Sequence, residues 1–150
     1  MNQDFVDLLR AFGAERVEYL VVAAHALAAH GHVRATRDLD VWIRPSADNA
    51  AHAYRALAAF GAPMGQIEEA DLSTPGTVVQ IGVAPVRIDV LTTIDGVDFD
   101  EAWRDKVATT FGAVPTFVLS REHLIRNKRA SGRLQDLADI ERLERGDDED

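Results

Sequence analysis

Two carboxylates separated by one residue lie where a polar stretch of the chain passes into an apolar run, in Arg34-Ala-Thr-Arg-Asp-Leu-Asp-Val-Trp42. Side chains i and i+2 of an extended strand point to the same face, so Asp38 and Asp40 are expected to project together. Carboxylates held side by side repel each other unless a proton or a cation lies between them. Hard divalent ions such as Mg²⁺ prefer oxygen ligands. The pair therefore indicates phosphoryl or nucleotidyl transfer.

A third carboxylate, Asp89, lies in a second β-rich run at residues 86–91. If this run pairs with the strand that carries the first two aspartates, all three meet at one edge of a sheet. Such clusters can hold two metal ions about 4 Å apart, and the third carboxylate could instead accept the proton of an attacking hydroxyl. The alternative is structural: Asp38 begins a turn, and Asp89 pairs with Arg87 or Arg37. The combination of three aspartates favours the site.

The pattern of apolar residues predicts the elements that must position these carboxylates. Helices are expected at about 3–13, 23–30, 46–60, 99–106, 120–130 and 134–143, and strands at 18–22, 39–43, 77–83, 86–91 and 116–119. Ser46 and Ser120 are the expected N-caps of two of the helices. Residues 61–76 are expected to form a loop with one helical turn near 66–72, and residues 84–85 a hairpin turn.

This order predicts an α/β (α+β) fold, in which helices pack on a small mixed β-sheet and a C-terminal helical pair closes the chain. Residues 1–150 are expected to form a single domain, with a core at about 1–119, the helical pair at about 120–145 and an acidic tail at 146–150. The last helix carries an apolar stripe that is expected to pack in the core, formed by Leu134, Leu137, Ile140 and Leu143.

The amino-acid composition excludes several classes of functional site. The 150 residues include no cysteine, which excludes disulfides, thiolate zinc sites and a cysteine nucleophile. No apolar run approaches the roughly 20 residues that span a bilayer, and the N-terminus lacks the pattern of a signal peptide. A cytoplasmic protein without a membrane partner is expected. The net charge of −9 argues against nonspecific binding of nucleic acid, but it allows a cationic small molecule, a protein, or an RNA held by a local basic patch.

Three segments together resemble the minimal nucleotidyltransferase superfamily, which has the polymerase-β-like fold of antibiotic nucleotidyltransferases and abortive-infection type toxins. They are Leu20-Val-Val-Ala-Ala-His-Ala-Leu27, Arg34-Ala-Thr-Arg-Asp-Leu-Asp-Val-Trp42 and Val86-Arg-Ile-Asp-Val-Leu91. Weaker similarity to the C-terminal helices of the family extends over Leu124-Ile-Arg-Asn-Lys-Arg-Ala130 and Arg133-Leu-Gln-Asp-Leu-Ala-Asp-Ile140. The resemblance thus runs from about Val17 to Leu143.

The resemblance implies Mg²⁺-dependent transfer of a nucleoside monophosphate from a nucleoside triphosphate (NTP) to an acceptor hydroxyl. Asp38, Asp40 and Asp89 would be the catalytic ligands of two Mg²⁺ ions. Lys128 would contact the nucleotide phosphates, and Asp136 would orient Lys128 or Arg133. The acceptor is not implied: it could be a small molecule, a protein, or a tRNA in the case of a toxin–antitoxin component. Pairing of two copies as a homodimer could supply a wall for it.

The chain departs from the family after the first strand, where Ala23-Ala24 replaces the usual Gly-Gly or Gly-Ser. Glycine permits positive φ and lets a ligand approach the backbone, whereas alanine in left-handed geometry costs about 1–2 kcal/mol. Ala23 and Ala24 would therefore face the triphosphate, and three outcomes are open: the replacement weakens nucleotide binding, abolishes it, or is tolerated in an altered loop. This leaves a catalytically impaired homologue that binds a nucleotide or a partner as an alternative. The simpler interpretation is that two good helix formers begin a helix.

Several residues near the aspartates are candidate phosphate contacts, each with a structural alternative. His25 either faces the phosphates or is an ordinary helix residue. Arg34, like Arg37, either contacts phosphate or neutralises the acidic cluster. Thr36 either touches a phosphate or caps a turn. Trp42 either forms the floor of a base pocket or, as is more common for a half-buried strand tryptophan, belongs to the core.

Overall fold

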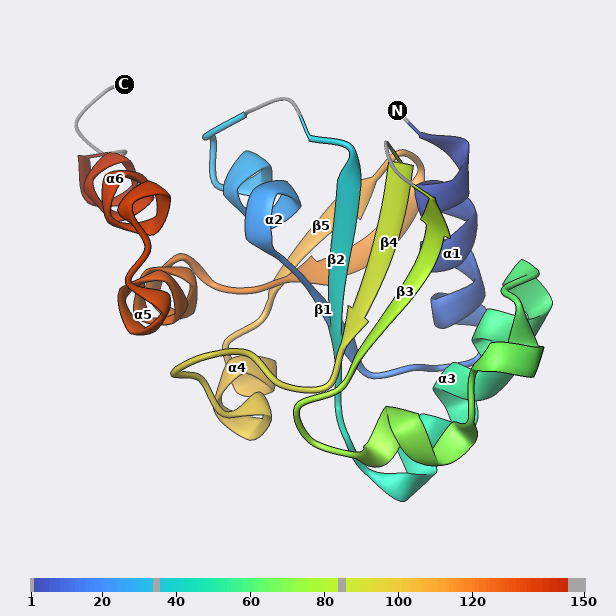
Figure 1. Cartoon of the computed structure of the whole chain (residues 1–150). Coiled ribbons are helices and arrows are strands. Elements are labelled where there is room, and N and C mark those ends of the chain that lie inside the picture. Colours follow the sequence, from blue (N-terminus) through green and yellow to red (C-terminus); the bar gives the residue numbers. More distant parts are fainter. Residues whose placement is uncertain (1, 34–35, 84–85, 146–150) are drawn as a thin grey trace.

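The computed structural model describes residues 2–33, 36–83 and 86–145, and in these ranges six α-helices and two 3₁₀ turns surround a six-stranded mixed sheet (Figure 1). The helices are α1 Gln3–Ala14, α2 Ala23–Ala29, α3 Ala47–Phe60, α4 Phe99–Arg104, α5 Arg121–Ser131 and α6 Leu134–Arg145. The strands are β1 Tyr19–Val22, β2 Asp38–Ile43, β3 Val78–Val83, β4 Val86–Leu91, β5 Val107–Phe111 and β6 Val114–Val118. The 3₁₀ turns are η1 Met64–Gln66 and η2 Glu69–Ser73. This is the α+β fold that the sequence predicts.

The sheet has the strand order β3-β4-β2-β1-β6-β5. Strand β2 pairs in parallel with β4 and antiparallel with β1, and β1 is parallel to β6. The pairs β3–β4 and β5–β6 are antiparallel. The central position of β2 means that the strand with two aspartates is flanked on both sides, by β4 and by β1.

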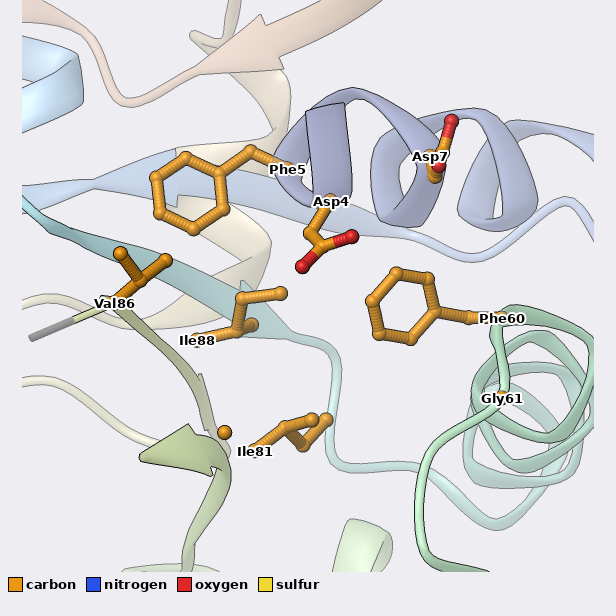
Figure 2. Close-up of a pocket in the computed structure, with 9 residues that line it drawn as sticks. Asp4, Phe5, Asp7, Phe60, Gly61, Ile81, Val86 and Ile88 are labelled. Carbon is orange, nitrogen blue, oxygen red and sulfur yellow. The ribbon is translucent and has the colours of Figure 1, made fainter. Parts of the chain in front are cut away.

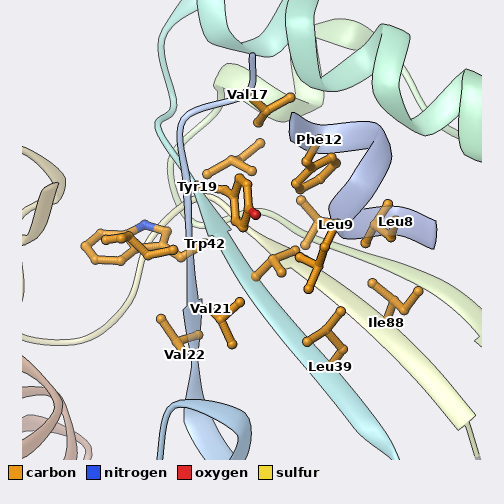
Figure 3. Close-up of a cluster of buried hydrophobic side chains, with 14 of the residues drawn as sticks. Leu8, Leu9, Phe12, Val17, Tyr19, Val21, Val22, Leu39, Trp42 and Ile88 are labelled. Atoms are coloured by element: carbon orange, nitrogen blue, oxygen red, sulfur yellow. The ribbon is translucent and has the colours of Figure 1, made fainter. Parts of the chain in front are cut away.

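Alternation along β2 separates an apolar face from a polar one. Leu39 and Val41 are fully buried, and Figure 3 shows Leu39 beside Ile88 and Leu8 on the side of α1. Trp42 lies on the other side of the sheet in the same view, the side to which Asp38 and Asp40 also project by their spacing of two. Its indole N–H donates to the carbonyl of Thr92, and the ring packs edge-on to Phe99 at 4.9 Å. The core interpretation of Trp42 is confirmed.

Helix starts agree closely with the sequence. The hydroxyl of Ser46 accepts from the backbone N–H of Asn49 at 3.2 Å, and that of Ser120 accepts from the N–H of His123 at 3.1 Å. These two caps satisfy donors that the first turn of a helix leaves free. The expected turn at residues 84–85 lies outside the described residues, although β3 and β4 pair as expected. Residues 61–76 contain two 3₁₀ turns instead of one helical turn.

The sequence did not predict β5. This strand is at the edge of the sheet and largely exposed, so its residues lack the alternation that identifies a half-buried strand. It becomes a strand by pairing with β6, with Thr109 opposite Thr116, around a turn in which Gly112 has φ of +61°.

The apolar stripe predicted on α6 is only half correct. Ile140 and Leu143 are buried, but Leu134 is 87% exposed and Leu137 is 49% exposed. On the face of α6 that meets α5, aspartates occupy the positions where apolar core residues were expected. They do so because they pair with a buried lysine of α5. In the part of the chain that the structure describes, no helix is long and apolar enough to cross a membrane.

Candidate active site

The parallel pairing of β2 with β4 brings the three aspartates together. Asp40 lies opposite Asp89, and Asp38 lies opposite Arg87. Asp89 is buried with 7% exposure, while Asp38 and Asp40 are half-buried. The expectation that the two strands are neighbours is confirmed. Residues 40 and 89 share a register position, so their carboxylates must interact across the two strands.

Arg87 supplies a positive charge to this cluster. Its Nη2 lies 3.4 Å from Oδ2 of Asp38 and 3.3 Å from Oδ2 of Asp89, and its Nε lies 3.1 Å from Oδ1 of Asp89. The structural alternative, in which Asp89 pairs with Arg87, therefore also holds. The two interpretations are compatible, since one arginine contacts two of the three carboxylates and leaves Asp40 with less compensation.

Asp40 is the carboxylate whose titration changes most clearly. Its burial, followed by the charges of Asp89 and Asp38 and a hydrogen bond with Asp89, raises the pKa of Asp40 from 3.8 to about 6. Arg87 opposes this rise only in part. A raised pKa means that a negative charge at this position lacks a full counter-charge, and a bound cation could supply it.

The oxygen atoms of the cluster suit a hard divalent ion. Oδ1 of Asp89 is buried and accepts no hydrogen bond within residues 2–33, 36–83 and 86–145. Within the same ranges, no three His, Cys, Asp or Glu side chains are already gathered as a metal-binding group. Carboxylates in such a cluster repel one another, and Arg87 contacts only two of the three. The donor type and the uncompensated charge fit Mg²⁺, for which the three aspartates are the candidate ligands.

The backbone between β1 and α2 makes its turn at one alanine. Ala23 has φ of +59° and immediately follows the last residue of β1, whereas Ala24 is not among the described residues with positive φ. The left-handed geometry that the sequence analysis considered for the Ala-Ala pair thus applies to Ala23 alone. Ala23 therefore occupies a conformation that glycine adopts without steric cost.

His25 lies against the start of β2. Burial lowers the pKa of the His25 imidazole, and the nearby backbone of Asp38 opposes this change. The ring packs edge-on to Phe5 and Phe111, with centroid distances of 5.6 and 5.2 Å. These contacts make His25 a neighbour of the carboxylate cluster through the backbone of Asp38.

The other predicted neighbours differ in their placement. Thr36 caps the turn: its Oγ1 accepts from the N–H of Asp38 and donates to the carbonyl of Asp38, both at 3.3 Å. Arg37 is exposed, and its carbonyl accepts from the N–H of Arg87 at 3.1 Å. Arg34 lies outside the described residues. The capping interpretation of Thr36 is therefore the one with observed contacts.

Lys128 lies in a buried ion-pair cluster between α5 and α6. Its Nζ is 3.0 Å from Oδ2 of Asp139 and 3.6 Å from Oδ1 of Asp136, with only 8% of the side chain exposed. Arg133 binds Asp136 through Nε at 2.8 Å and Nη2 at 3.2 Å. Asp136 thus contacts both cations that the sequence analysis considered. Asp139 was missed, although its spacing of three from Asp136 places the two on one helix face.

A cavity of about 490 Å³ borders Asp40, the one member of the aspartate cluster among its lining residues. Its walls combine the turn after β1, the end of β4 with the following loop, and the C-terminal half of α5. The lining residues are Val22, Ala23, Asp40, Leu91, Thr93, Ile94, Asp95, Asn127, Ser131 and Arg133. The sequence analysis did not single out Thr93, Asp95, Asn127 or Ser131, because no spacing relates them before the chain folds.

Contacts between the loop and α5 define one wall of this cavity. Asn127 donates to the carbonyl of Asp95 at 2.9 Å, and Ser131 donates to a carboxylate oxygen of Asp95 at 3.2 Å. Gly96 has φ of +76°, and a Cβ placed there would lie 2.6 Å from the Cβ of Ala130. Only glycine fits this close approach, which holds the loop against the helix.

A second cavity, of about 310 Å³, is lined by residues of α1, the end of α3, β3 and β4. Figure 2 shows the carboxylate of Asp4 directed toward Phe60 and Ile88 there. Ile88 neighbours Asp89 in the chain but points to the opposite face of β4. This cavity is therefore separate from the carboxylate cluster.

The fold is nucleotidyltransferase-like, as comparison with solved structures shows. A candidate nucleotidyltransferase from Thermotoga maritima matches with a TM-score of 0.60 and 15% identity over 97% of this chain and 91% of its own. The lincosamide antibiotic adenylyltransferase LnuA, solved with lincomycin bound, matches with a TM-score of 0.59 and 14% identity over 96% of both chains. No model of a protein family matches the chain, and no curated protein matches its sequence.

Proposed function

We propose that this chain is a metal-dependent nucleotidyltransferase that moves a nucleoside monophosphate from an NTP to an acceptor hydroxyl. The observation that carries the proposal is the register of β2 against β4, which sets Asp40 beside Asp89 at the edge of a cavity of about 490 Å³. Two structures of similar fold are described as nucleotidyltransferases, which supports the same class of reaction.

In the proposed reaction, the acceptor oxygen bonds to the α-phosphorus of the NTP. The bond from that phosphorus to the bridging oxygen breaks, and pyrophosphate leaves with the electron pair. Asp89, which lies opposite Asp40, either binds a metal ion or receives the hydroxyl proton in this proposal. Proton transfer of this kind contributes about 10²–10⁴ in rate. When bound by Asp38, Asp40 and Asp89, Mg²⁺ supplies positive charge against the charge that develops on the phosphoryl oxygens.

Two cations near α6 take different roles in this proposal. Arg133 lines the cavity, and its guanidinium is held at the mouth by the bidentate bond to Asp136, so we assign it to the nucleotide phosphates. Lys128 already neutralises Asp136 and Asp139 in a buried cluster. We therefore assign Lys128 to orienting Asp136, and through it Arg133, instead of direct phosphate contact.

Ala23 favours a second candidate function, nucleotide binding without turnover. Ala23 lines the cavity, and its backbone is left-handed, with φ of +59°. A methyl group there limits how closely a phosphate can approach the backbone. The same scaffold would then bind a nucleotide, or a partner protein, but transfer nothing.

Labelled nucleotides separate these candidates. The four NTPs, labelled at the α- or the γ-phosphate, are incubated with Mg²⁺ and cell extract, and the RNA, protein and small-molecule fractions are counted. The wild-type protein should incorporate the α-label and not the γ-label, and Asp89→Asn should lower incorporation at least about 100-fold. The matched control is Asp4→Asn, which removes a carboxylate from the second cavity and should incorporate label at the wild-type rate.

Three outcomes would decide against transfer. Equal incorporation by wild-type and Asp89→Asn proteins would contradict the site, and incorporation of the γ-label would indicate phosphoryl transfer instead. Mg²⁺-dependent NTP binding that Asp40→Ala abolishes, without incorporation into any fraction, would support the binding homologue. The fraction that acquires the label identifies the class of acceptor.

A further inference from the structure

The loop after β4 is joined to α5 by two hydrogen bonds to a single residue, Asp95. Asn127 donates to the backbone carbonyl of Asp95 at 2.9 Å, and the hydroxyl of Ser131 donates to Oδ2 of Asp95 at 3.2 Å. All three residues line the cavity of about 490 Å³ that Asp40 borders. Asp95 therefore binds α5 through both its backbone and its carboxylate, at two positions one helical turn apart.

The residue after Asp95 packs closely against the same helix. Gly96 has φ of +76°, and a Cβ placed there would lie 2.6 Å from the Cβ of Ala130 and 3.3 Å from the carbonyl oxygen of Arg126. Residues 126, 127, 130 and 131 lie on one side of α5. The loop thus contacts that side over a full turn, and the loop and the helix form one continuous wall of the cavity.

This wall leads directly to Arg133. Helix α5 ends at Ser131, and Arg133 follows two residues later. Its guanidinium is bound by Asp136 at 2.8 and 3.2 Å, which fixes it relative to α6. The bond from Ser131 to Asp95 fixes the end of α5 relative to the loop after β4. These contacts together relate the position of Arg133 to the strand that carries Asp89.

We infer that Asp95 is a positioning residue, which sets where Arg133 stands in the cavity relative to Asp40 by holding the end of α5 against the loop after β4. The inference rests on the proposed function, in which Arg133 binds the phosphates of the NTP. Groups that position a substrate lose much of their effect when they are displaced by about 1 Å. Removal of the Asp95 carboxylate should therefore lower NTP affinity, and it should do so through Arg133.

The test is calorimetric titration of the whole chain with Mg²⁺ and the four α,β-methylene NTPs, whose bridging carbon prevents transfer, beside thermal unfolding of each variant. Arg133→Met should weaken binding about 10- to 100-fold, because it removes charge-assisted hydrogen bonds to phosphate. Asp95→Ala should weaken binding about 3- to 10-fold. Added to Arg133→Met, it should cause no further loss, since a residue that acts through Arg133 then has nothing left to position.

Two further variants separate the hydrogen bond from the charge of Asp95. Asp95→Asn keeps an oxygen that can accept from Ser131, so it should bind the NTP analogues nearly as the wild-type protein does. Ser131→Ala breaks the same bond from the helix side and should repeat the loss of affinity. This second variant carries the test if Asp95→Ala does not fold.

The matched control is Asp98→Ala. Asp98 lies three residues after Asp95, and its carboxylate caps α4 by accepting from the N–H of Asp100 at 3.1 Å. This variant also removes a carboxylate from the segment after β4, but it should bind the NTP analogues with wild-type affinity. An equal loss of affinity in Asp98→Ala and Asp95→Ala would overturn the inference, because it would reflect general loosening of this segment.

Other outcomes would also overturn it. These are wild-type affinity in a folded Asp95→Ala or Ser131→Ala protein, equal losses in Asp95→Asn and Asp95→Ala, and an undiminished effect of Asp95→Ala beside Arg133→Met. If Arg133→Met weakens binding and Asp95→Ala does not, only the role of Asp95 is wrong. If Arg133→Met binds as the wild-type protein does, the assignment of Arg133 to the phosphates is wrong, and the inference fails with it.

Discussion

Asp40 has a less favourable environment than either of its acidic neighbours. Arg87 contacts Asp38 and Asp89, but Asp40 lies beside both of them with burial raising its pKa to about 6. A group of this kind reduces the stability of the folded chain, and such groups are concentrated where a protein binds or transforms a ligand. The cost is consistent with a cation site, since a bound divalent ion would remove the repulsion.

Asp40→Asn is expected to stabilise the metal-free protein at pH 7.5 by about 1–2 kcal/mol, allowing for partial solvent screening. The pKa of Asp40 is raised from 3.8 to about 6 in the folded state, so folding favours the protonated form. The destabilisation by the ionised carboxylate is fully present above pH 6 and disappears as the pH falls toward 3.8.

Urea unfolding in the presence of a chelator, at intervals from pH 4 to pH 8, measures this difference. The two proteins should have similar free energies of unfolding near pH 4, diverge as the pH rises from about 4 to about 6, and differ by a constant amount above that. A gain that is the same at every pH would show that the carboxylate does not titrate as described.

The junction of β1 with α2 concentrates a conformational constraint in one residue. Strand β1 ends at Val22 and helix α2 begins at Ala23 without an intervening loop. The backbone of Ala23 is left-handed, with φ of +59°. Residues other than glycine have a steric penalty in the left-handed region of φ/ψ space. Ala24 already has helical geometry. Replacement by glycine should therefore relieve strain at Ala23 but destabilise the helix at Ala24.

Ala23→Gly should raise nucleotide affinity severalfold and change the free energy of unfolding by no more than about 1 kcal/mol. Relief of about 1–2 kcal/mol of left-handed strain is partly offset by the greater backbone entropy of glycine in the unfolded chain. Ala24→Gly is the matched control and should lower stability by about 0.5–1 kcal/mol without a gain in affinity. Calorimetric titration with NTP and Mg²⁺, beside urea unfolding, measures both. A larger gain in affinity for Ala24→Gly would contradict the assignment of the turn to Ala23.

The position of the cavity depends on the docking of the two C-terminal helices beside the sheet. The α5–α6 pair stands at one side of the sheet in Figure 1, and α5 contributes Asn127 and Ser131 to the cavity wall. Buried charges join the two helices, with Lys128 between Asp136 and Asp139. Removal of one charged side chain from this buried ion-pair cluster leaves opposite charge buried with less compensation. The position of Arg133 at the cavity therefore depends on this cluster.

Lys128→Met is expected to destabilise the fold by about 3–5 kcal/mol, because it removes the buried cation that contacts both Asp136 and Asp139. Arg129→Met is the matched control, since Arg129 is the next residue on α5 and also forms an ion pair, with Glu144 at 3.1 Å. That pair is exposed, so its loss should cost no more than about 1 kcal/mol. Chemical denaturation of the two variants measures the contrast. Equal, small losses in both would mean that the Lys128 cluster does not hold α6.

Elements with strong local signals were predictable from sequence, and elements that depend on partners were not. The N-caps Ser46 and Ser120 and the two strands with aspartates have signals within a few residues. Strand β5 does not, because its exposed residues are specified by pairing with β6. Leu134 and Leu137 misled the analysis of α6 because periodicity alone does not say which face a neighbouring helix covers.

The sequence by itself determined the three carboxylates, the common strand face of Asp38 and Asp40, and the unusual Ala23-Ala24 junction, since each follows from residue type and spacing along the chain. Only the tertiary structure decided that Asp40 lies opposite Asp89 and that Arg87 contacts two of the carboxylates. It also decided that Lys128 is buried between aspartates. These contacts join residues far apart in the chain, and strand register and helix docking set them.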